Sequence, residues 1–233
     1  MTGTIINIIT VLIGGILGIL FGSRLPDKLK LTIITALGLF TAAIGLQMFL
    51  KTENPIIVLG GLLIGVLLGE WWRIEDGLQN LGAWLERRFA ADKEDSNRFV
   101  RGFLTASLLF CVGPMTILGS IQDGLTGDYS LLAVKSVLDG FAALAFASSL
   151  GIGVLFSALV ILFYQGGITL LASQVQTIVT TQMMNEMTAS GGIILIALSL
   201  SNLLEIKKIR AGNFLPALIV TPLIAALMRW FIK

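Results

Sequence analysis

The sequence contains no histidine, and its single cysteine, Cys111, lies in the middle of an apolar run. These absences exclude catalysis by a histidine acid or base, zinc or haem ligation by histidine, and any disulfide within the chain. Charged residues are also scarce, at 13% of the 233 residues, whereas an ordinary soluble domain carries about 25%. Much of the familiar chemistry of enzymes is thereby excluded, and we expect no cofactor, no metal and no enzymatic activity.

Apolar residues make up 55% of the chain, and the mean hydropathy is +0.91. A run of about 20 apolar residues is needed to cross a bilayer core. We therefore predict an all-α integral membrane protein with about eight transmembrane helices. The predicted spans are residues 4–22, 31–50, 55–72, 99–121, 130–148, 151–173, 190–206 and 213–231.

Basic residues concentrate in every second connection between these spans. The connections at 22–30, 73–98 and 205–212 are rich in lysine and arginine, whereas the opposite connections contain Lys51 as their only basic residue. Because basic loops stay in the cytoplasm, both termini are predicted to lie outside it. The net charge of +2 is too small to suggest nucleic acid as a partner.

The only sizeable polar segment covers residues 73–98. Its apolar residues recur at helical spacing, with charges between them, which predicts an amphipathic helix on the cytoplasmic membrane surface. A solvated connector is the alternative interpretation. The apolar residues are Ile74, Leu78, Leu81, Leu85 and Phe89.

A short internal similarity suggests a repeat. Residues 18–29 and 35–43 can be laid over residues 116–125 and 136–144, so that Gly22 falls on Gly119. Spans 1–3 and spans 4–6 run in opposite directions, so a tandem duplication would be inverted in the membrane, as in many secondary transporters. The match is short and needs a gap, and chance could produce it.

This repeat predicts three parts of the chain. Residues 1–98 form a first three-helix repeat with the amphipathic segment, 99–175 form a second repeat with an interrupted helix, and 176–233 add two helices. Glycines spaced four apart in spans 1 and 3 predict close helix packing, within the chain or between copies of it. These glycines are Gly14, Gly18, Gly22, Gly61, Gly65 and Gly69.

The fourth span contains Gly113 and Pro114 in mid-membrane. Proline removes a backbone donor, so we expect at least a kink, and a discontinuous helix whose exposed ends bind an ion or substrate is the sharper hypothesis. Ser120 and Asp123 follow closely. Asp123 precedes a glycine, which indicates a turn, and a partly buried hairpin would place its carboxylate near membrane depth.

Two opposite charges, Lys135 and Asp139, lie in the fifth span. Their spacing of four places them on one helix face, where they can neutralise each other. A structural ion pair is one interpretation, but ionisable residues inside a membrane are expensive to bury and usually functional. Gln165 is a polar neighbour that could complete a binding site.

Four stretches carry a family resemblance: "GPMTILGSIQDGLTGD", "KSVLDGFAALAFASSLGIGV", "YQGGIT" and "NLLEIKKIRAGNFLPAL". Together they resemble the YdfK/YqgA-like family of uncharacterised bacterial multi-pass membrane proteins, over essentially the whole chain. The resemblance implies a protein of the bacterial inner membrane and names no substrate. It directs attention to Asp123, Lys135, Asp139 and Gln165, which fall in these stretches.

The leading hypothesis is a small secondary transporter or ion-coupled carrier. Asp139 would take up a proton or cation beside Lys135, and helix ends near Pro114 and Ser120 would hold the substrate. A channel or a non-transporting oligomeric scaffold is the alternative, and a membrane enzyme with a Ser/Lys dyad comes third. The expected partners are the lipid bilayer, an unknown small solute or ion, and further copies of the chain.

Overall fold

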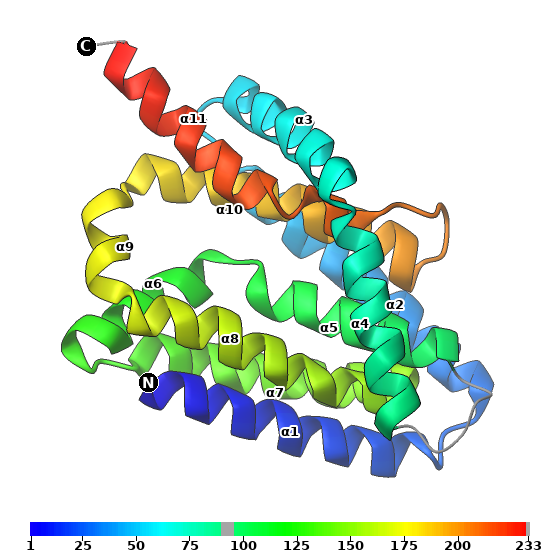
Figure 1. Ribbon diagram of the computed structural model, residues 1–233. Coiled ribbons are helices and arrows are strands. Elements are labelled where there is room, and N and C mark those ends of the chain that lie inside the picture. The colour runs from blue at the N-terminus through cyan, green and yellow to red at the C-terminus, as the bar shows by residue number, and fades with distance from the viewer. Residues whose placement is uncertain (90–95, 232–233) are drawn as a thin grey trace. The chain divides into compact units, whose positions relative to one another are not determined.

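The computed structural model describes residues 1–89 and 96–231, which form helices joined by turns, with no strand among them (Figure 1). Residues 90–95 of the predicted amphipathic segment and the last two residues lie outside this description. Within it, seven helices are long and apolar enough to cross a membrane, or eight if one bent pair counts as a span. The predicted all-α membrane protein is confirmed.

The α-helices of the seven candidate membrane spans correspond to predicted spans. They are α1 (Thr2–Gly22), α2 (Asp27–Phe49), α3 (Pro55–Trp72), α7 (Ser130–Leu150), α8 (Ser157–Leu170), α10 (Thr181–Leu198) and α11 (Ala217–Phe231). The other helices are α4 (Ile74–Phe89), α5 (Ser96–Cys111), α6 (Pro114–Thr126), α9 (Ala172–Ile178), the 3-10 helices η2 (Ile152–Phe156) and η4 (Ala211–Phe214), and the π-helical turn η3 (Ser199–Leu203).

The chain divides into two compact units. The first unit comprises residues 1–37 and 79–178, and the second comprises residues 38–78 and 179–233. Each unit therefore joins segments that are far apart in the sequence. The predicted division at residues 98 and 175, and the inverted repeat behind it, stay predictions.

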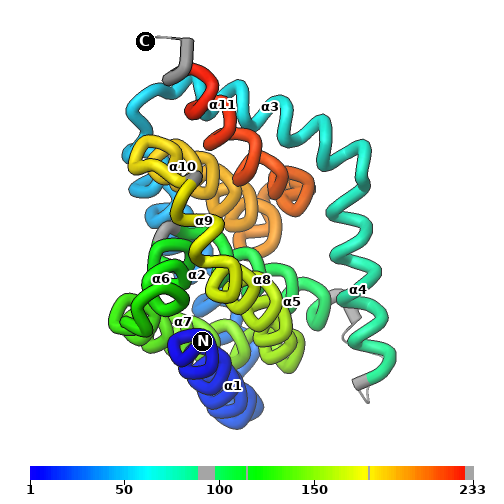
Figure 2. Tube along the Cα trace, turned by 60° about the vertical axis from the view of Figure 1, so that its left-hand side comes forward, coloured from blue at the N-terminus to red at the C-terminus, as the bar shows by residue number. Residues whose placement is uncertain are grey.

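The central contact of the first unit joins α1 to α7, which lie side by side in Figures 1 and 2. A Cβ at Gly14, Gly18 or Gly22 would overlap, in that order, the carbonyl oxygens of Gly140, Leu144 and Ser148. The two helices therefore run parallel, backbone against backbone, as the four-residue glycine spacing predicted. The opposite face of α1 exposes isoleucines, including Ile5, Ile9 and Ile13, that suit contact with lipid.

The fourth predicted span is broken at its proline, as expected. Helix α5 ends at Cys111 and α6 begins at Pro114, and the two axes are bent by 61°. The parallel packing of α1 and α7 indicates how α5 and α6 cross the membrane. If α1, α2 and α3 each cross the membrane, α7 can run parallel to α1 only when the chain crosses once more between α3 and α7. We therefore take α5 and α6 together as one broken span.

In the second unit, glycines spaced four apart again allow close packing, here between antiparallel segments. Along α3, Cβ atoms at Gly61, Gly65 and Gly69 would overlap Thr221, Ala217 and Asn213 in turn. Helix α10 packs on α11, and the two helices share with α3 a small apolar core that contains Ile57, Met183 and Ala225. The glycines of both predicted faces are therefore occupied within one chain.

Two boundaries differ from prediction. Span 7 begins at Thr181 rather than 190, because the Thr180 side chain accepts a hydrogen bond from the Met183 amide at 3.3 Å and caps a helix through residues with polar side chains. Asp123 lies inside α6 rather than in a turn. The turn comes at Gly127, whose φ of 73° suits glycine and ends the helix.

Candidate functional site

The buried charges of α7 form the centre of the candidate site. Lys135 is 6% exposed and Asp139 is 8% exposed, and the Lys135 ammonium donates to Asp139 Oδ2 within the helix. Counted from Ser130 at 1.5 Å per residue, the two residues lie roughly 8 and 14 Å along α7, so neither is at a helix end. The sequence-based prediction of an i, i+4 ion pair facing protein is confirmed as geometry.

Asn7 of α1 connects this pair to α8. Its Nδ2 donates to Asp139 Oδ2 and to Gln165 Oε1, each at 3.0 Å, and the side chain is completely buried. Because both partners are acceptors, they determine which end of the amide carries the nitrogen. Asn7 Oδ1 consequently makes neither of these two contacts, and it has no hydrogen-bond partner within the described residues.

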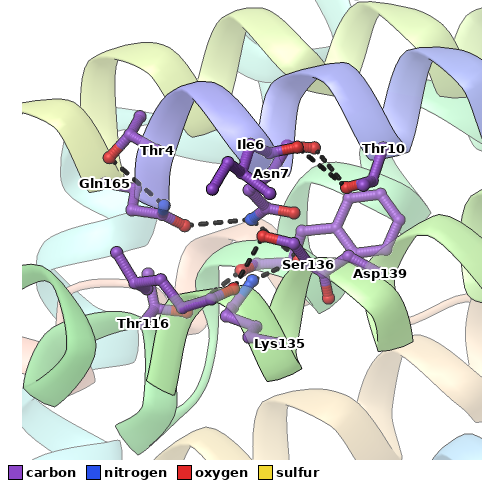
Figure 3. A network of polar contacts seen from close by, with 11 residues as sticks. Thr4, Ile6, Asn7, Thr10, Thr116, Lys135, Ser136, Asp139 and Gln165 are labelled. Atoms are coloured by element: carbon purple, nitrogen blue, oxygen red, sulfur yellow. Dashed lines mark hydrogen bonds and ion pairs between the residues drawn. The ribbon is translucent and has the colours of Figure 1, made fainter. Parts of the chain in front are cut away.

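The network continues from Gln165 toward the start of α1 (Figure 3). Gln165 Nε2 donates to Thr4 Oγ1 at 3.2 Å, and the Thr4 and Thr169 hydroxyls lie 3.4 Å apart. The Thr169 hydroxyl in turn donates to the Gln165 carbonyl at 2.9 Å. A continuous chain of buried polar groups thus runs from Asp139 along α1 and α8 to the N-terminal end of α1.

Helix α6 presents a polar face to the same unit. Asp123 Oδ2 lies 3.0 Å from the Gly3 amide, which donates to it, and 3.0 Å from the Met1 amine. Thr116 and Ser120 precede Asp123 by two turns and one turn on this face. Ser120 is completely buried, and its Oγ has no partner within the part of the chain described.

The break in the fourth span lies close to the charged pair. Cys111, the last residue of α5, is buried within electrostatic range of Lys135 and Asp139. The Thr116 hydroxyl reaches back over the break and donates to the Phe110 carbonyl at 3.2 Å. That bond satisfies one of the carbonyls that the interruption frees, as interrupted membrane helices require.

The arrangement does not contain a Ser/Lys dyad. Ser136 Oγ donates to the Leu132 carbonyl at 2.6 Å, and the Lys135 ammonium is engaged by Asp139. Among the described residues, neither Ser120 nor Ser136 has a hydrogen bond to Lys135. The Lys135 ammonium is thus paired with a carboxylate rather than with a serine hydroxyl.

The structure brings together Lys135, Asp139 and Gln165, which the sequence singled out. Asp123, Ser120 and the start of α6 at Pro114 belong to the same unit but lie outside the hydrogen-bonded chain. Asn7 joins α7 to α8 and was missed. A signal existed, since it is the one amide side chain in the first predicted span.

The second unit buries a carboxylate that the sequence analysis also missed, because residues 174–189 were taken as an outer connection. Glu186 of α10 is completely buried and accepts three hydrogen bonds. The donors are the Thr52 hydroxyl at 2.5 Å, the Glu53 amide at 2.9 Å and the Asn54 amide at 3.0 Å. Glu186 thereby holds the turn that precedes α3.

Comparison with known proteins gives one family and two relatives. The family model described as "Protein of unknown function (DUF554)" matches residues 2–226. The "Uncharacterized membrane protein YdfK" of Bacillus subtilis (strain 168) is 32% identical over 235 residues, which cover 99% of this chain and 98% of the relative. The "Uncharacterized protein YqgA" of Escherichia coli (strain K12) is 36% identical over 233 residues, 98% of each chain. No solved structure matches significantly.

Proposed function

The chain belongs to the DUF554 family of membrane proteins, as its motifs indicated, and from its buried polar network we propose that it is a small secondary transporter or ion-coupled carrier. Its place would be the bacterial inner membrane. The membrane character follows from the helices and from the relative's name. The substrate class and the coupling ion belong to the proposal.

The observation that carries the proposal is the buried Lys135–Asp139 pair with its link through Asn7 to Gln165. A buried ion pair adds little net stability, because desolvation of both charges offsets most of their attraction. Two apolar residues would pack α7 at least as well. Because ionisable residues inside a membrane are usually functional, we infer that the pair takes part in transport, with Asp139 as the ion site and Lys135 as its charge partner.

The broken span supports the same interpretation. Transporter sites commonly lie where a discontinuous helix exposes backbone groups near the bilayer midplane. Here Pro114 starts the second half-helix, and Asp123 lies one turn beyond Ser120, whose hydroxyl has no hydrogen-bond partner in the described part of the chain. In the proposal these groups and Gln165 line the substrate's route to Asp139.

The alternative of an oligomeric scaffold depended on glycine faces that could join copies of the chain. In the structure these faces pack against α7 and α11 of the same chain. A channel is distinguished by function, because it passes unitary currents in planar bilayers without a coupling gradient. The packing of the glycines therefore favours the carrier over the scaffold.

The test is transport in proteoliposomes by wild type and Asp139→Asn. Solid-supported membrane currents would be recorded while amino acids, carboxylates and amines are applied in turn under a proton or sodium gradient. We expect a solute-driven current that Asp139→Asn abolishes although the variant folds. Glu186→Gln is the matched control, since it neutralises a buried carboxylate outside the site. Full activity of Asp139→Asn, or no current with any solute or gradient, contradicts the proposal.

A further inference from the structure

We propose that Asp139 and Asn7 form a binding site for an alkali-metal cation, which competes with the Lys135 ammonium for the Asp139 carboxylate. The inference rests on the proposed carrier function and names the class of ion that its central site takes. It adds Asn7 as a ligand and Gln165 as the residue that positions Asn7. Two features of the network carry it.

The first feature is the unpartnered amide oxygen of Asn7. The side chain is completely buried, and Oδ1 has no hydrogen-bond partner within the described residues. A buried acceptor without a partner has lost its hydrogen bonds to water and gained nothing in return, which is costly. The nitrogen of the same amide donates to Asp139 Oδ2 at 3.0 Å, so the amide group that carries the free oxygen is in contact with the buried carboxylate. A cation bound by the carboxylate and by the amide oxygen would satisfy this free acceptor.

The second feature is that the orientation of Asn7 is imposed by its neighbours. Gln165 Oε1 accepts from Asn7 Nδ2, while Gln165 Nε2 is held by Thr4, whose hydroxyl lies beside that of Thr169. The amide therefore cannot exchange the places of its nitrogen and oxygen without losing two hydrogen bonds. Preorganised oxygen ligands of this kind are what hard cations need.

The chemistry of these ligands selects the ion. An amide oxygen is an acceptor, which excludes an anion and does not hold a proton at physiological pH. Divalent hard cations are usually bound by several carboxylates, and no group of three or more acidic, histidine or cysteine side chains that could hold a metal is found among the described residues. One carboxylate with neutral oxygens suits a monovalent cation.

Lys135 is the built-in competitor. Its ammonium occupies Asp139 Oδ2 in the structure, and its four-carbon stem allows the charge to swing away from the carboxylate. Two cations cannot share one buried carboxylate without leaving an unpaired charge, so binding of one displaces the other. Removal of Lys135 should therefore strengthen alkali-cation binding.

The experiment measures thermal unfolding of the full chain in detergent. A fluorogenic maleimide reports unfolding through Cys111, the only cysteine, which is buried. Lys135→Met would be compared with wild type in lithium, sodium, potassium and choline chloride at equal ionic strength. We expect the variant to be destabilised in choline and rescued by at least one alkali cation. Its apparent affinity should be about tenfold or more tighter than that of wild type.

Two further variants keep the test decisive if Lys135→Met does not fold. We expect Asn7→Ala to raise the alkali-cation concentration needed to stabilise the protein by about tenfold, and Asp139→Asn to abolish the response. Asn185→Ala, which removes an amide bonded to Glu53 in the second unit, should respond like wild type. Identical unfolding in all four salts, or an unchanged response in Asn7→Ala, overturns the site.

The outcome separates this inference from the proposed function. Solute-driven currents that depend on Asp139, together with no alkali-cation effect on unfolding, would retain the carrier and remove the cation site. Stabilisation by an alkali cation without transport of any solute would retain the site and remove the carrier.

Discussion

The two units bury carboxylates in opposite ways. In the second unit, Glu186 accepts three hydrogen bonds from Thr52 and from the amides of the turn before α3. In the first unit, Asp139 is held by a lysine and an asparagine, and the asparagine oxygen has no hydrogen-bond partner among the residues that the structure describes. A carboxylate with three hydrogen-bond donors from one turn anchors that turn, whereas a carboxylate paired with a lysine is the kind of group that our proposal requires.

Replacement of Glu186 tests the structural side of this contrast. Glu186→Ala leaves a hydroxyl and two amides without their acceptor, so we expect the free energy of unfolding to fall by about 2–4 kcal/mol. Thermal unfolding in detergent measures the loss. The response to alkali cations should persist at temperatures where the variant is folded. A change of less than about 0.5 kcal/mol would show that water replaces the carboxylate and that Glu186 is not a structural anchor.

The glycine contacts of the first unit provide a second test. Gly14→Ala would place a Cβ against the Gly140 carbonyl oxygen and force α1 away from α7, at a cost of about 1–3 kcal/mol. Gly167→Ala is the control, because nothing lies within 4 Å of its Cβ position. Equal stability of the two variants in thermal unfolding would contradict the close parallel packing.

The same comparison in the second unit uses adjacent glycines. Gly61→Ala would collide with Thr221 across the α3–α11 contact, and we expect a loss of about 1–3 kcal/mol. Gly60→Ala meets only Ile224, at 3.7 Å, and should change stability by less than about 1 kcal/mol. Thermal unfolding of the two variants measures these losses. A larger loss for Gly60→Ala than for Gly61→Ala would contradict the antiparallel packing of α3 on α11.

Asp123 lies in the first unit, but like Glu186 it accepts a hydrogen bond from a backbone amide, here that of Gly3. We expect Asp123→Asn to lower the free energy of unfolding by about 1 kcal/mol and to leave alkali-cation rescue of Lys135→Met intact. The double variant, titrated with the rescuing cation, measures both. Loss of rescue would place Asp123 in the ion site itself rather than only along the proposed substrate route.

The smallest effect is expected at the surface cluster where α3 meets α4. A hydrogen bond from Arg73, opposed by partial desolvation and aided by Arg210, holds the pKa of Asp76 below its ordinary value of 3.8. A lowered folded-state pKa means stability that is present above pH 3.8 and lost as the pH falls through the folded value. Asp76→Asn should therefore cost a little at pH 7, nothing in strong acid, and less in high salt. A difference between variant and wild type that grows toward acid pH would reverse this sign.

Much of the architecture could be predicted because hydropathy and glycine spacing act locally. Runs of about 20 apolar residues determine where a chain can cross a bilayer, and Pro114 interrupts a helix wherever it stands. The start of span 7 was missed because Glu186 looks like a loop residue. Only its partners, Thr52 and the following amides, make it tolerable inside a helix.

The site was predictable in part for a related reason. Lys135 and Asp139 are neighbours on one helix, so their spacing alone pairs them. Asn7 lies 132 residues from Asp139 and 158 residues from Gln165 along the chain, and no local pattern reports that its amide joins the two.

The sequence by itself determined the membrane class, the break at Pro114, the glycine faces and the charged pair on α7, since each depends on residue type and spacing along one helix. Only the tertiary structure decided that α1 runs parallel to α7 and that the Asn7 amide donates to Asp139. The oxygen of this amide has no hydrogen-bond partner among the described residues. The tertiary structure also decided that Glu186 accepts three hydrogen bonds from the turn before α3, while Asp139 is held by Lys135 and Asn7. The physical reason is that the role of a buried charge depends on the donors around it, and donors such as Asn7 and Thr52 come from distant segments.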